Sequence, residues 1–348
     1  MKKIKKTVQV GNVLMGGTNP IIIQSMTTTK TQDAISTVKQ ILELEKAGCE
    51  IVRVAVPDMD AAKAIKEIKK EIHIPLVADI HFDYKLAIES VDNGIDKIRI
   101  NPGNIGAKWK VKEIVDRISD KNIPIRIGVN SGSIEDYLID KHRGPTPKAM
   151  VESAMNHIKI LEDLNYNQIV LSLKSSDVLK TIEAYKLINL KSDYPLHLGV
   201  TEAGTLLGGT VKSALGIGNL LLSDIGDTIR VSISADPVEE IRVAKMILQD
   251  LDLRLFGPKL IACPTCGRTN IDIIEIANRV EKALESVKKP ITVAVMGCAV
   301  NGPGEAKEAD IGIAGGVGEA LLFKKGKPIR KIEEKNIVKE LLEEIEKI

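Results

Sequence analysis

Aromatic residues, net charge and long apolar runs are all scarce in this chain, and each scarcity excludes a class of function. Phenylalanine, tryptophan and tyrosine make up 3% of the 348 residues, so the core must be aliphatic and surfaces for stacking bases are few. Lysine and arginine number 49 against 47 acidic residues, a near-balance that argues against bulk electrostatic binding of nucleic acid.

Membrane and export signals are also missing from the sequence. The basic start, MKKIKKTVQVGN, is not followed by the apolar segment of a signal peptide, and no run of about eighteen apolar residues is present to span a bilayer. We therefore expect a soluble, cytoplasmic protein with neither a membrane nor a nucleic acid as partner.

Only four cysteines occur, and their positions are uneven. Cys263, Cys266 and Cys298 lie in the last quarter of the chain, which favours a metal site in a reducing compartment over a disulfide framework. Cys49 stands alone and is expected to be a small buried hydrophobe.

Short runs rich in β-branched residues alternate with segments whose apolar residues recur every three or four positions. Near-continuous apolar strands that alternate with helices predict a parallel sheet buried on both faces, an α/β fold. Eight such units within about 250 residues favour a closed (β/α)8 TIM barrel over an open doubly wound sheet. The eight runs are Ile21–Thr27, Glu50–Val56, Pro75–Phe82, Asp96–Gly103, Pro124–Asn130, Gln168–Ser175, Pro195–Glu202 and Asp227–Ser234.

The pattern differs at both ends of the barrel segment. Thr7–Gly17 predicts a hairpin that turns at Gly11-Asn12 and plugs the barrel floor. After Pro258 the order becomes mixed, which predicts a small α+β domain, so we expect a barrel over residues 1–253 and a second domain over residues 254–348. The elements expected there are strands at Lys259–Ala262, Ile291–Met296, Ile311–Ala314 and Ala320–Phe323, and helices at Ile271–Val287 and Glu333–Ile348.

Polar and charged side chains stand late in the predicted strands, at the end where barrel enzymes carry their active sites. Charges inside buried strands are costly unless something pairs with them. Because cations from different strands converge there with few acids, we predict a phosphate-rich small molecule in preference to structural ion pairs. The expected contacts are Arg53, Arg99, Asn101, Arg126, Asn130, Lys174, Ser232 and His81.

Two of the polar residues at these strand ends have open roles. Glu202, an acid among cations, is expected to donate or accept a proton, and its alternative role is to neutralise Lys174. His81 either touches the ligand or is structural.

The second domain carries the motif Cys263-Pro-Thr-Cys266 and, about thirty residues on, Cys298 in a glycine-flanked turn. Such thiols suit zinc or a redox dithiol. However, no histidine or further cysteine lies nearby to complete a tetrahedral zinc site, and the turn before Glu305 can bring that carboxylate back towards Cys298. Three soft thiolates favour a [4Fe–4S] cluster, with the harder carboxylate as a weaker, exchangeable ligand.

The chain carries the stretches SMTTTKTQD, RVAVPD, ADIHFD, KIRINPGN, IRIGVNSGS, LSLKSSD, LGVTEAG, RVSIS, ACPTCGR and GCAVNGPGE. Together they resemble the hydroxymethylbutenyl diphosphate synthase family of the methylerythritol phosphate route to isoprenoids, in its compact bacterial type. The resemblance runs nearly end to end, and its two cysteine motifs are specific to the family.

The resemblance implies roles for individual residues. Cys263, Cys266 and Cys298 would hold the [4Fe–4S] cluster with Glu305 as fourth ligand, and Glu202 and Asn301 would lie near the reacting carbons or the cluster. The residues implied to hold the substrate diphosphate are Arg53, Arg99, Arg126, Lys174 and Ser232.

The implied reaction is a two-electron reductive ring opening and dehydration of 2-C-methyl-D-erythritol 2,4-cyclodiphosphate to 4-hydroxy-3-methylbut-2-enyl diphosphate. Its electrons would come from ferredoxin or flavodoxin. Two alternatives remain at this point: a non-redox phosphate-binding lyase or transferase with a structural zinc, and an iron–sulfur scaffold or sensor without turnover.

The link between the two predicted domains bears on oligomeric state. The eighth barrel helix, about Pro237–Gln249, is expected to end at the barrel floor, and Asp250–Pro258 reaches about 30 Å when fully extended. That is short for climbing the barrel to its opposite end. We therefore expect a head-to-tail homodimer in which the cluster domain of one chain caps the barrel of the other, as the resemblance also implies.

Overall fold

The computed structural model describes residues 4–298, 304 and 306–348. The chain divides into two compact units, Met1–Arg254 and Leu255–Ile348. None of the helices in the described part is long and apolar enough to cross a membrane.

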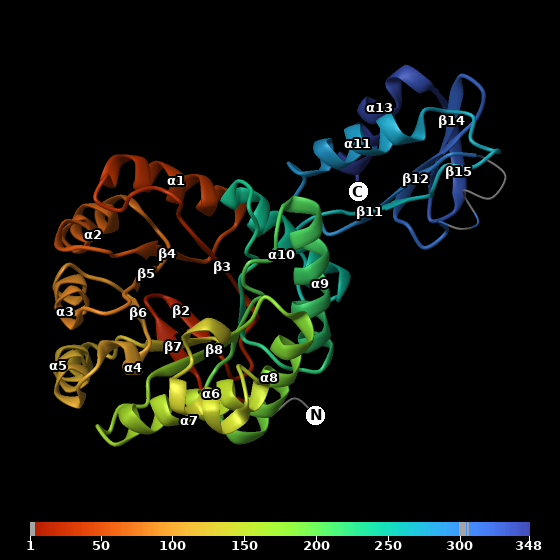
Figure 1. The fold of residues 1–348 in the computed structure, drawn as a ribbon. Coiled ribbons are helices and arrows are strands. Elements are labelled where there is room, and N and C mark those ends of the chain that lie inside the picture. The colour runs from red at the N-terminus through yellow and green to blue at the C-terminus, as the bar shows by residue number, and fades with distance from the viewer. Residues whose placement is uncertain (1–3, 299–303, 305) are drawn as a thin grey trace. The chain divides into compact units, whose positions relative to one another are not determined.

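A parallel barrel forms the first unit, as the sequence predicts (Figure 1). Its strands run in the order β8-β7-β6-β5-β4-β3-β10-β9, and a parallel bridge between Leu171 and Leu196 joins β8 to the chain just before β9, which closes the ring. The strands are β3 (Ile22–Met26), β4 (Ile51–Ala55), β5 (Leu76–Asp79), β6 (Lys97–Ile100), β7 (Ile125–Asn130), β8 (Ile169–Lys174), β9 (His197–Leu198) and β10 (Thr228–Ile229).

Helices cover the outside of the barrel and turn their apolar faces inward. Several of them begin at an aspartate that caps the amino-terminal end of the helix: the side chains of Asp33, Asp58 and Asp177 accept hydrogen bonds from first-turn backbone N–H groups. The helices are α1 (Ala34–Ala47), α2 (Met59–Glu71), α3 (Tyr84–Asp92), α5 (Lys108–Ile118), α7 (Pro147–Glu162), α8 (Val178–Lys191), α9 (Leu206–Leu222) and α10 (Pro237–Asp250), with the shorter α4 (Pro102–Ile105) and α6 (Asp136–His142) in loops.

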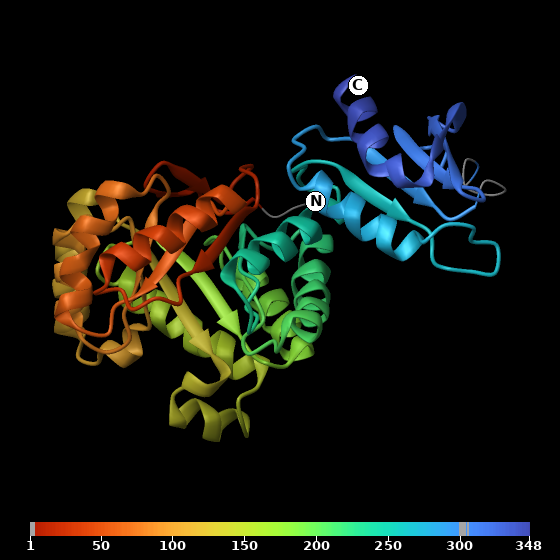
Figure 2. The ribbon, with the colours of Figure 1, turned by 90° about the horizontal axis from the view of Figure 1, so that it is seen from above.

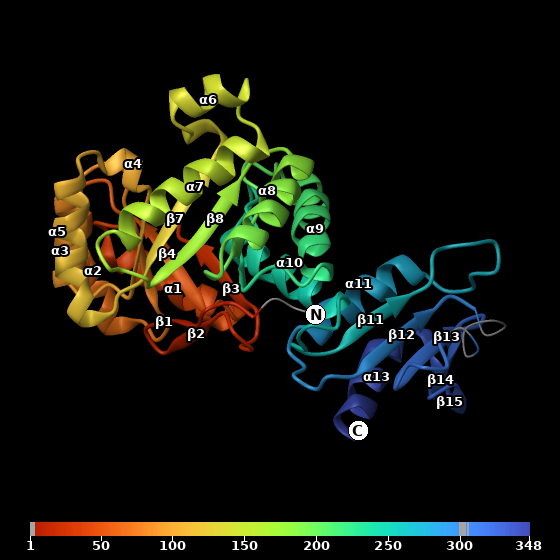
Figure 3. The ribbon, with the colours of Figure 1, turned by 90° about the horizontal axis from the view of Figure 1, so that it is seen from below.

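The predicted hairpin is present and closes the amino-terminal end of the barrel. Its strands β1 (Val8–Val10) and β2 (Val13–Met15) are antiparallel, and Gly11 takes a positive φ of 54° in the turn. Side chains of both strands form one buried cluster with Ile22, Ile51, Val77 and Val170, which come from four barrel strands. Figures 2 and 3 show the hairpin at one end of the barrel and α6, which follows the carboxyl end of β7, at the other.

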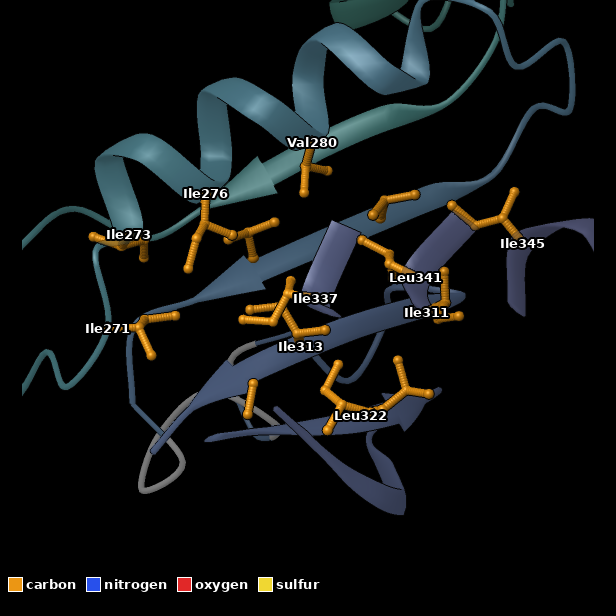
Figure 4. Packing of buried hydrophobic residues seen from close by; sticks show 14 of the residues in the cluster. Ile271, Ile273, Ile276, Val280, Ile311, Ile313, Leu322, Ile337, Leu341 and Ile345 are labelled. Atoms are coloured by element: carbon orange, nitrogen blue, oxygen red, sulfur yellow. The ribbon is translucent and has the colours of Figure 1, made fainter. Parts of the chain in front are cut away.

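The second unit is a five-stranded sheet with two helices on one face (Figure 4). Isoleucines 273 and 276 of α11 point onto the sheet beside Leu341 of α13, which explains why both helices are strongly amphipathic. The elements are β11 (Lys259–Ala262), α11 (Ile273–Leu284), β12 (Thr292–Met296), β13 (Ile311–Gly315), β14 (Glu319–Lys324), β15 (Lys327–Glu333) and α13 (Ile337–Glu346).

The strand β15 was absent from the sequence prediction, and the final helix begins at Ile337, later than the predicted Glu333. The reason is the pattern of β15: among its residues only Ile332 is buried, and the strand forms the edge of the sheet. Edge strands with charged side chains lack the apolar run by which buried strands are identified.

Replacing Met15 by alanine tests the floor of the barrel. The side chain is fully buried in the hairpin cluster, so its loss should lower the free energy of unfolding by about 2–5 kcal/mol. Urea unfolding followed by circular dichroism measures this. Leu14→Ala is the matched control, because Leu14 on the same strand is 45% exposed and its loss should change stability by no more than about 0.5 kcal/mol. Equal effects of the two substitutions would contradict a packed floor.

Candidate active site

The carboxyl ends of the barrel strands surround a cavity of about 180 Å³, here called the barrel mouth. Parallel strands deliver the side chains of their last residues to the same end, so residues distant in sequence meet there. The lining residues are Arg53, Asp79, His81, Arg99, Arg126, Gly128, Asn130, Ser172, Lys174, Thr201, Arg230 and Ser232.

Asp79, at the end of β5, is shared by two arginines. Its Oδ1 accepts a hydrogen bond from Arg99 Nη1 at 3.0 Å, and its Oδ2 lies 3.6 Å from Arg53 Nε. Burial alone would raise the pKa of Asp79, but Arg53, a hydrogen bond from His81 and Arg99 together hold it below its ordinary value. The carboxylate therefore stays ionised and holds both guanidinium groups in position.

Two further cations have no such partner. Arg126 is 2% exposed, and its Nε and Nη1 find no hydrogen-bond acceptor among the described residues. Lys174 Nζ lies 3.4 Å from His197 Nε2, and no described carboxylate forms an ion pair with it. Burial, followed by the neighbouring arginines, lowers the pKa of Arg126 and that of Lys174 well below their ordinary values. Uncompensated buried cations of this kind are stabilised by a bound anion.

Arg230 is held in place by a carboxylate that lies outside the lining of the barrel mouth. Its Nη2 donates to Glu240 Oε1 of α10 at 3.3 Å, and the other carboxylate oxygen of the buried Glu240 accepts from Ser25 Oγ at 2.8 Å. Gly128 clears space on the opposite wall, because a Cβ there would lie 2.7 Å from Arg99 Nε. A small residue on one strand thus admits the long cation of its neighbour.

The structure brings most of the predicted contacts together, with two exceptions. Asn101 is buried outside the lining, and its Oδ1 accepts from the backbone N–H of Gly103 at 3.1 Å, as the cap of α4. Glu202 is exposed and directly follows the lining residue Thr201. Its φ of 52° lies in the left-handed region, which is strained for a residue other than glycine and is often found at functional sites.

Sequence reasoning predicted Ser232 but missed two other hydroxyl side chains of the barrel mouth. Ser172 and Thr201 both line it, although serine and threonine within an apolar strand are unremarkable in sequence. Ser172 could have been found from its position two residues before Lys174, since alternate residues of a strand share a face. His197, which the sequence pattern does not single out, also lies buried beside Lys174.

In the second unit, the loops that carry the cysteines begin at the carboxyl ends of two neighbouring strands. Cys263 follows β11, Cys298 follows β12 after one glycine, and these two strands are parallel neighbours. The backbone N–H of Gly297 donates to Cys263 Sγ at 3.1 Å, and Cys266 is exposed. Asn301 and Glu305 lie outside the described residues.

The cysteines fit a soft-metal centre by chemistry. Free thiols from two adjacent loops can ligate one cluster, and an N–H donor to sulfur is a typical feature of iron–sulfur sites. Within the described residues no three histidine, cysteine, aspartate or glutamate side chains are grouped closely enough to hold a metal ion. Any such centre therefore depends on how the loops close around it.

A closed barrel with a cationic mouth, followed by a smaller sheet domain that carries three cysteines, defines a two-domain TIM-barrel protein. Two family models match it: the GcpE TIM-barrel domain over residues 5–245 and the GcpE protein C-terminal domain over residues 259–347. The chain belongs to the GcpE family.

Curated relatives match the chain from end to end. A protein of Caldanaerobacter subterraneus subsp. tengcongensis is 59% identical over 100% of this chain and 98% of its own length, and one of Clostridium perfringens is 59% identical over 100% and 99%. Both are named 4-hydroxy-3-methylbut-2-en-1-yl diphosphate synthase (flavodoxin).

Two solved structures of low sequence identity match about seven tenths of the chain. The dihydropteroate synthase of Stenotrophomonas maltophilia, with imidazole bound in its active site, is 10% identical, with a TM-score of 0.52 over 71% of this chain and 98% of that one. The Yersinia pestis enzyme in complex with a sulfonamide drug is 11% identical, with a TM-score of 0.51 over 72% of this chain and 100% of that one. At these identities the likeness shows the fold.

Lys174→Ala and Arg126→Ala test whether the barrel mouth binds an anion. Each removes a charge-assisted hydrogen bond worth about 1.5–3 kcal/mol, so affinity for inorganic pyrophosphate should fall roughly ten- to more than a hundredfold. Isothermal calorimetry measures the affinity. The control is Arg117→Ala, an exposed arginine of α5 that pairs with Asp92 and should bind pyrophosphate as the wild type does. Unaltered affinity in both mouth variants would remove these residues from the anion site.

Proposed function

We propose that this protein is a 4-hydroxy-3-methylbut-2-en-1-yl diphosphate synthase. It would reduce 2-C-methyl-D-erythritol 2,4-cyclodiphosphate with two electrons, open its ring and release water to form 4-hydroxy-3-methylbut-2-enyl diphosphate. The observation that carries this proposal is the pair of buried cations, Arg126 and Lys174, left without a carboxylate in a chain whose relatives carry that name from end to end.

The barrel supplies the anchor for the substrate. Arginine side chains offer two-pronged contacts to the phosphate oxygens, and Lys174 offers a point charge. The hydroxyl of Ser232 and the amide of Asn130 line the same cavity and add neutral donors. Because these groups bind the diphosphate end of the substrate, which does not react, they fix the position of the reacting carbons.

Acidic residues of the barrel take two different roles. Asp79 positions Arg53 and Arg99 without contacting the anion itself, since its charge would repel a phosphate. Glu202 at the rim would supply or accept the proton that accompanies ring opening.

The second unit would carry the redox centre. Cys263, Cys266 and Cys298 would hold a [4Fe–4S] cluster, with Glu305 as the fourth ligand and Asn301 beside it. When bound, such a cluster supplies single electrons and a Lewis-acidic iron. Flavodoxin, which the names of the relatives include, is the proposed electron donor, with ferredoxin as the substitute. The proposed location is the cytoplasm, where thiols stay reduced.

Anaerobic purification with iron and sulfide analysis tests the cluster and the function together. Cys263→Ser, Cys266→Ser and Cys298→Ser should each lose most of the iron and all measurable turnover of the cyclic diphosphate, because each removes a thiolate ligand. Glu305→Ala should assemble the cluster and lose turnover. Cys49→Ser is the matched control: this thiol is buried in the barrel, where its Sγ donates to Ile51 O, and iron content should be unchanged.

A colourless wild-type protein that carries zinc, with no conversion of the cyclic diphosphate under reducing conditions, would overturn the proposal. That result would support the lyase or transferase with a structural zinc.

We further propose that the protein is a homodimer whose sites combine the barrel of one chain with the cysteine loops of the other. Residues 251–258 connect α10 to β11, and this connecting segment spans about 30 Å when fully extended. α10, like the other barrel helices, runs back towards the floor, so this length is short for reaching the mouth of the same barrel.

The outer face of α9 supports a second copy as the partner. Leu207, Val211, Leu215 and Leu222 are 80%, 51%, 59% and 74% exposed, and their spacing places them on one side of the helix. The helix has one charged residue, Lys212, and no acid, so it offers little for a charged partner to pair with. A twofold axis instead sets the same apolar stripe against itself, which is a self-complementary contact.

Co-expression of Lys174→Ala and Cys263→Ser chains tests the shared site. Each homodimer should be nearly inactive, whereas a mixed dimer would hold one site with an intact barrel and intact cysteines. Tandem affinity tags isolate the mixed dimer, and its turnover should approach half that of the wild type, since about one site in two is complete. An inactive mixed dimer, isolated and loaded with iron, would mean that each chain forms its own site.

A further inference from the structure

The barrel mouth holds more positive charge than its acids can balance. Five lysine and arginine side chains line it, whereas Asp79 is the one carboxylate of the lining in the described part of the chain. Asp79 is already shared between Arg53 and Arg99, and Glu240, outside the lining, pairs with Arg230. The empty site therefore carries a surplus of buried cations, and that surplus is costly.

Lys174 is the cation of this group that can lose its proton. Four of the five are arginines, whose guanidinium groups stay protonated in proteins. A buried lysine can instead become a neutral amine. Lys174 is 7% exposed and lies at the carboxyl end of β8, among arginines of other strands.

The position of Lys174 Nζ is defined by His197. The two nitrogens, Nζ and Nε2, are 3.4 Å apart, and the other ring nitrogen, Nδ1, lies 3.2 Å from Thr228 Oγ1. The backbone carbonyl of His197 accepts a hydrogen bond from the hydroxyl of Tyr185 on α8. Thr228 thus holds the imidazole at Nδ1 and Tyr185 holds the backbone of His197; with the ring proton on Nδ1, Nε2 accepts a hydrogen bond from the lysine.

The surroundings of this pair are predominantly cationic, and the nearby acids Asp79 and Glu240 are paired with arginines. Burial, then Arg126, Arg230, Arg53 and Arg99, lowers the pKa of Lys174. Burial, then Arg126, Lys174, Lys97 and Arg53, lowers the pKa of His197, so the imidazole stays neutral. The largest influences on both residues are burial and neighbouring cations, whereas the carboxylate of Asp79, in the same cavity, is already shared between Arg53 and Arg99.

We propose that binding of the substrate diphosphate is coupled to the uptake of one proton by Lys174, with His197 as the positioning residue that holds its Nζ in the barrel mouth. This inference rests on the proposed function for the identity of the anion. A proton passes from solvent to Nζ, a new N–H bond forms and the charge of the side chain rises from zero to one. The ammonium then donates to a phosphate oxygen and to His197.

The direction of the pH dependence follows from the charges. At a pH below the lowered pKa of the free site, Lys174 already carries its proton and binding takes up none. The anion raises the pKa of Lys174, so between the free and bound values each binding event draws a proton from solvent. Affinity therefore falls with rising pH through that window, by about tenfold per pH unit.

Isothermal calorimetry of the wild-type protein with the cyclic diphosphate, without reductant, tests the coupling directly. Both phosphates of this substrate are esterified, so it has no proton of its own that titrates near neutral pH. Titrations between about pH 7 and 9, in buffers that differ in ionisation enthalpy, should show a heat that depends on the buffer and corresponds to about one proton taken up. A buffer-independent heat, together with a flat pH profile of affinity, overturns the inference and leaves the proposed function intact.

Matched variants assign the proton. Lys174→Arg, which stays charged at every pH, should bind without proton uptake, and Lys97→Met should keep the uptake although it removes the other buried lysine. His197→Leu, which removes the acceptor for Nζ, should shift the pH profile, whereas a merely structural role would leave its midpoint unchanged. Loss of uptake in Lys97→Met but not in Lys174→Arg would overturn the assignment. A wild-type protein that fails to bind the cyclic diphosphate at all would overturn both this inference and the proposed function.

Discussion

The shortage of negative charge at the carboxyl end of the barrel is the constraint on which the rest of the site depends. Asp79 is ionised because arginines flank it, and those arginines hold their orientation because Asp79 is ionised. Among the described residues no carboxylate forms an ion pair with Arg126 or Lys174. Such charges are costly among buried aliphatic strands, and a bound anion completes the charge balance.

Rigid elements keep these charges close together. Arg99 of β6 is in register with Arg126 of β7 on one side and with Asp79 of β5 on the other, while Arg53 lies on β4, and hydrogen bonds to the next strand fix each backbone. The side chains need little reorganisation when a ligand arrives, so binding energy is available to orient the substrate. The helices outside and the hairpin at the floor contribute by preventing the strands from moving apart.

Much of the barrel and of its cationic lining could be predicted from the sequence because buried strands leave an apolar run, and a lysine or arginine inside such a run is conspicuous. Other features leave weaker traces. β15 is an edge strand with one buried residue, so its pattern resembles a loop. Asn101 follows a strand as a ligand-binding residue would, yet its amide serves as a helix cap, a choice that depends on the local turn. The role of His197 depends on which residue of β8 lies opposite, and a single strand cannot reveal its neighbour.

The hairpin at the floor restricts how ligands enter and leave the barrel. Because Met15 and its neighbours fill the amino-terminal end, the barrel in the described part of the chain is open to ligands at its carboxyl end. Whatever enters must leave by the same route, so a departing molecule and an arriving one cannot pass each other. The proposed product keeps the diphosphate that the cations hold, and its exit therefore sets the earliest moment at which the next substrate can enter.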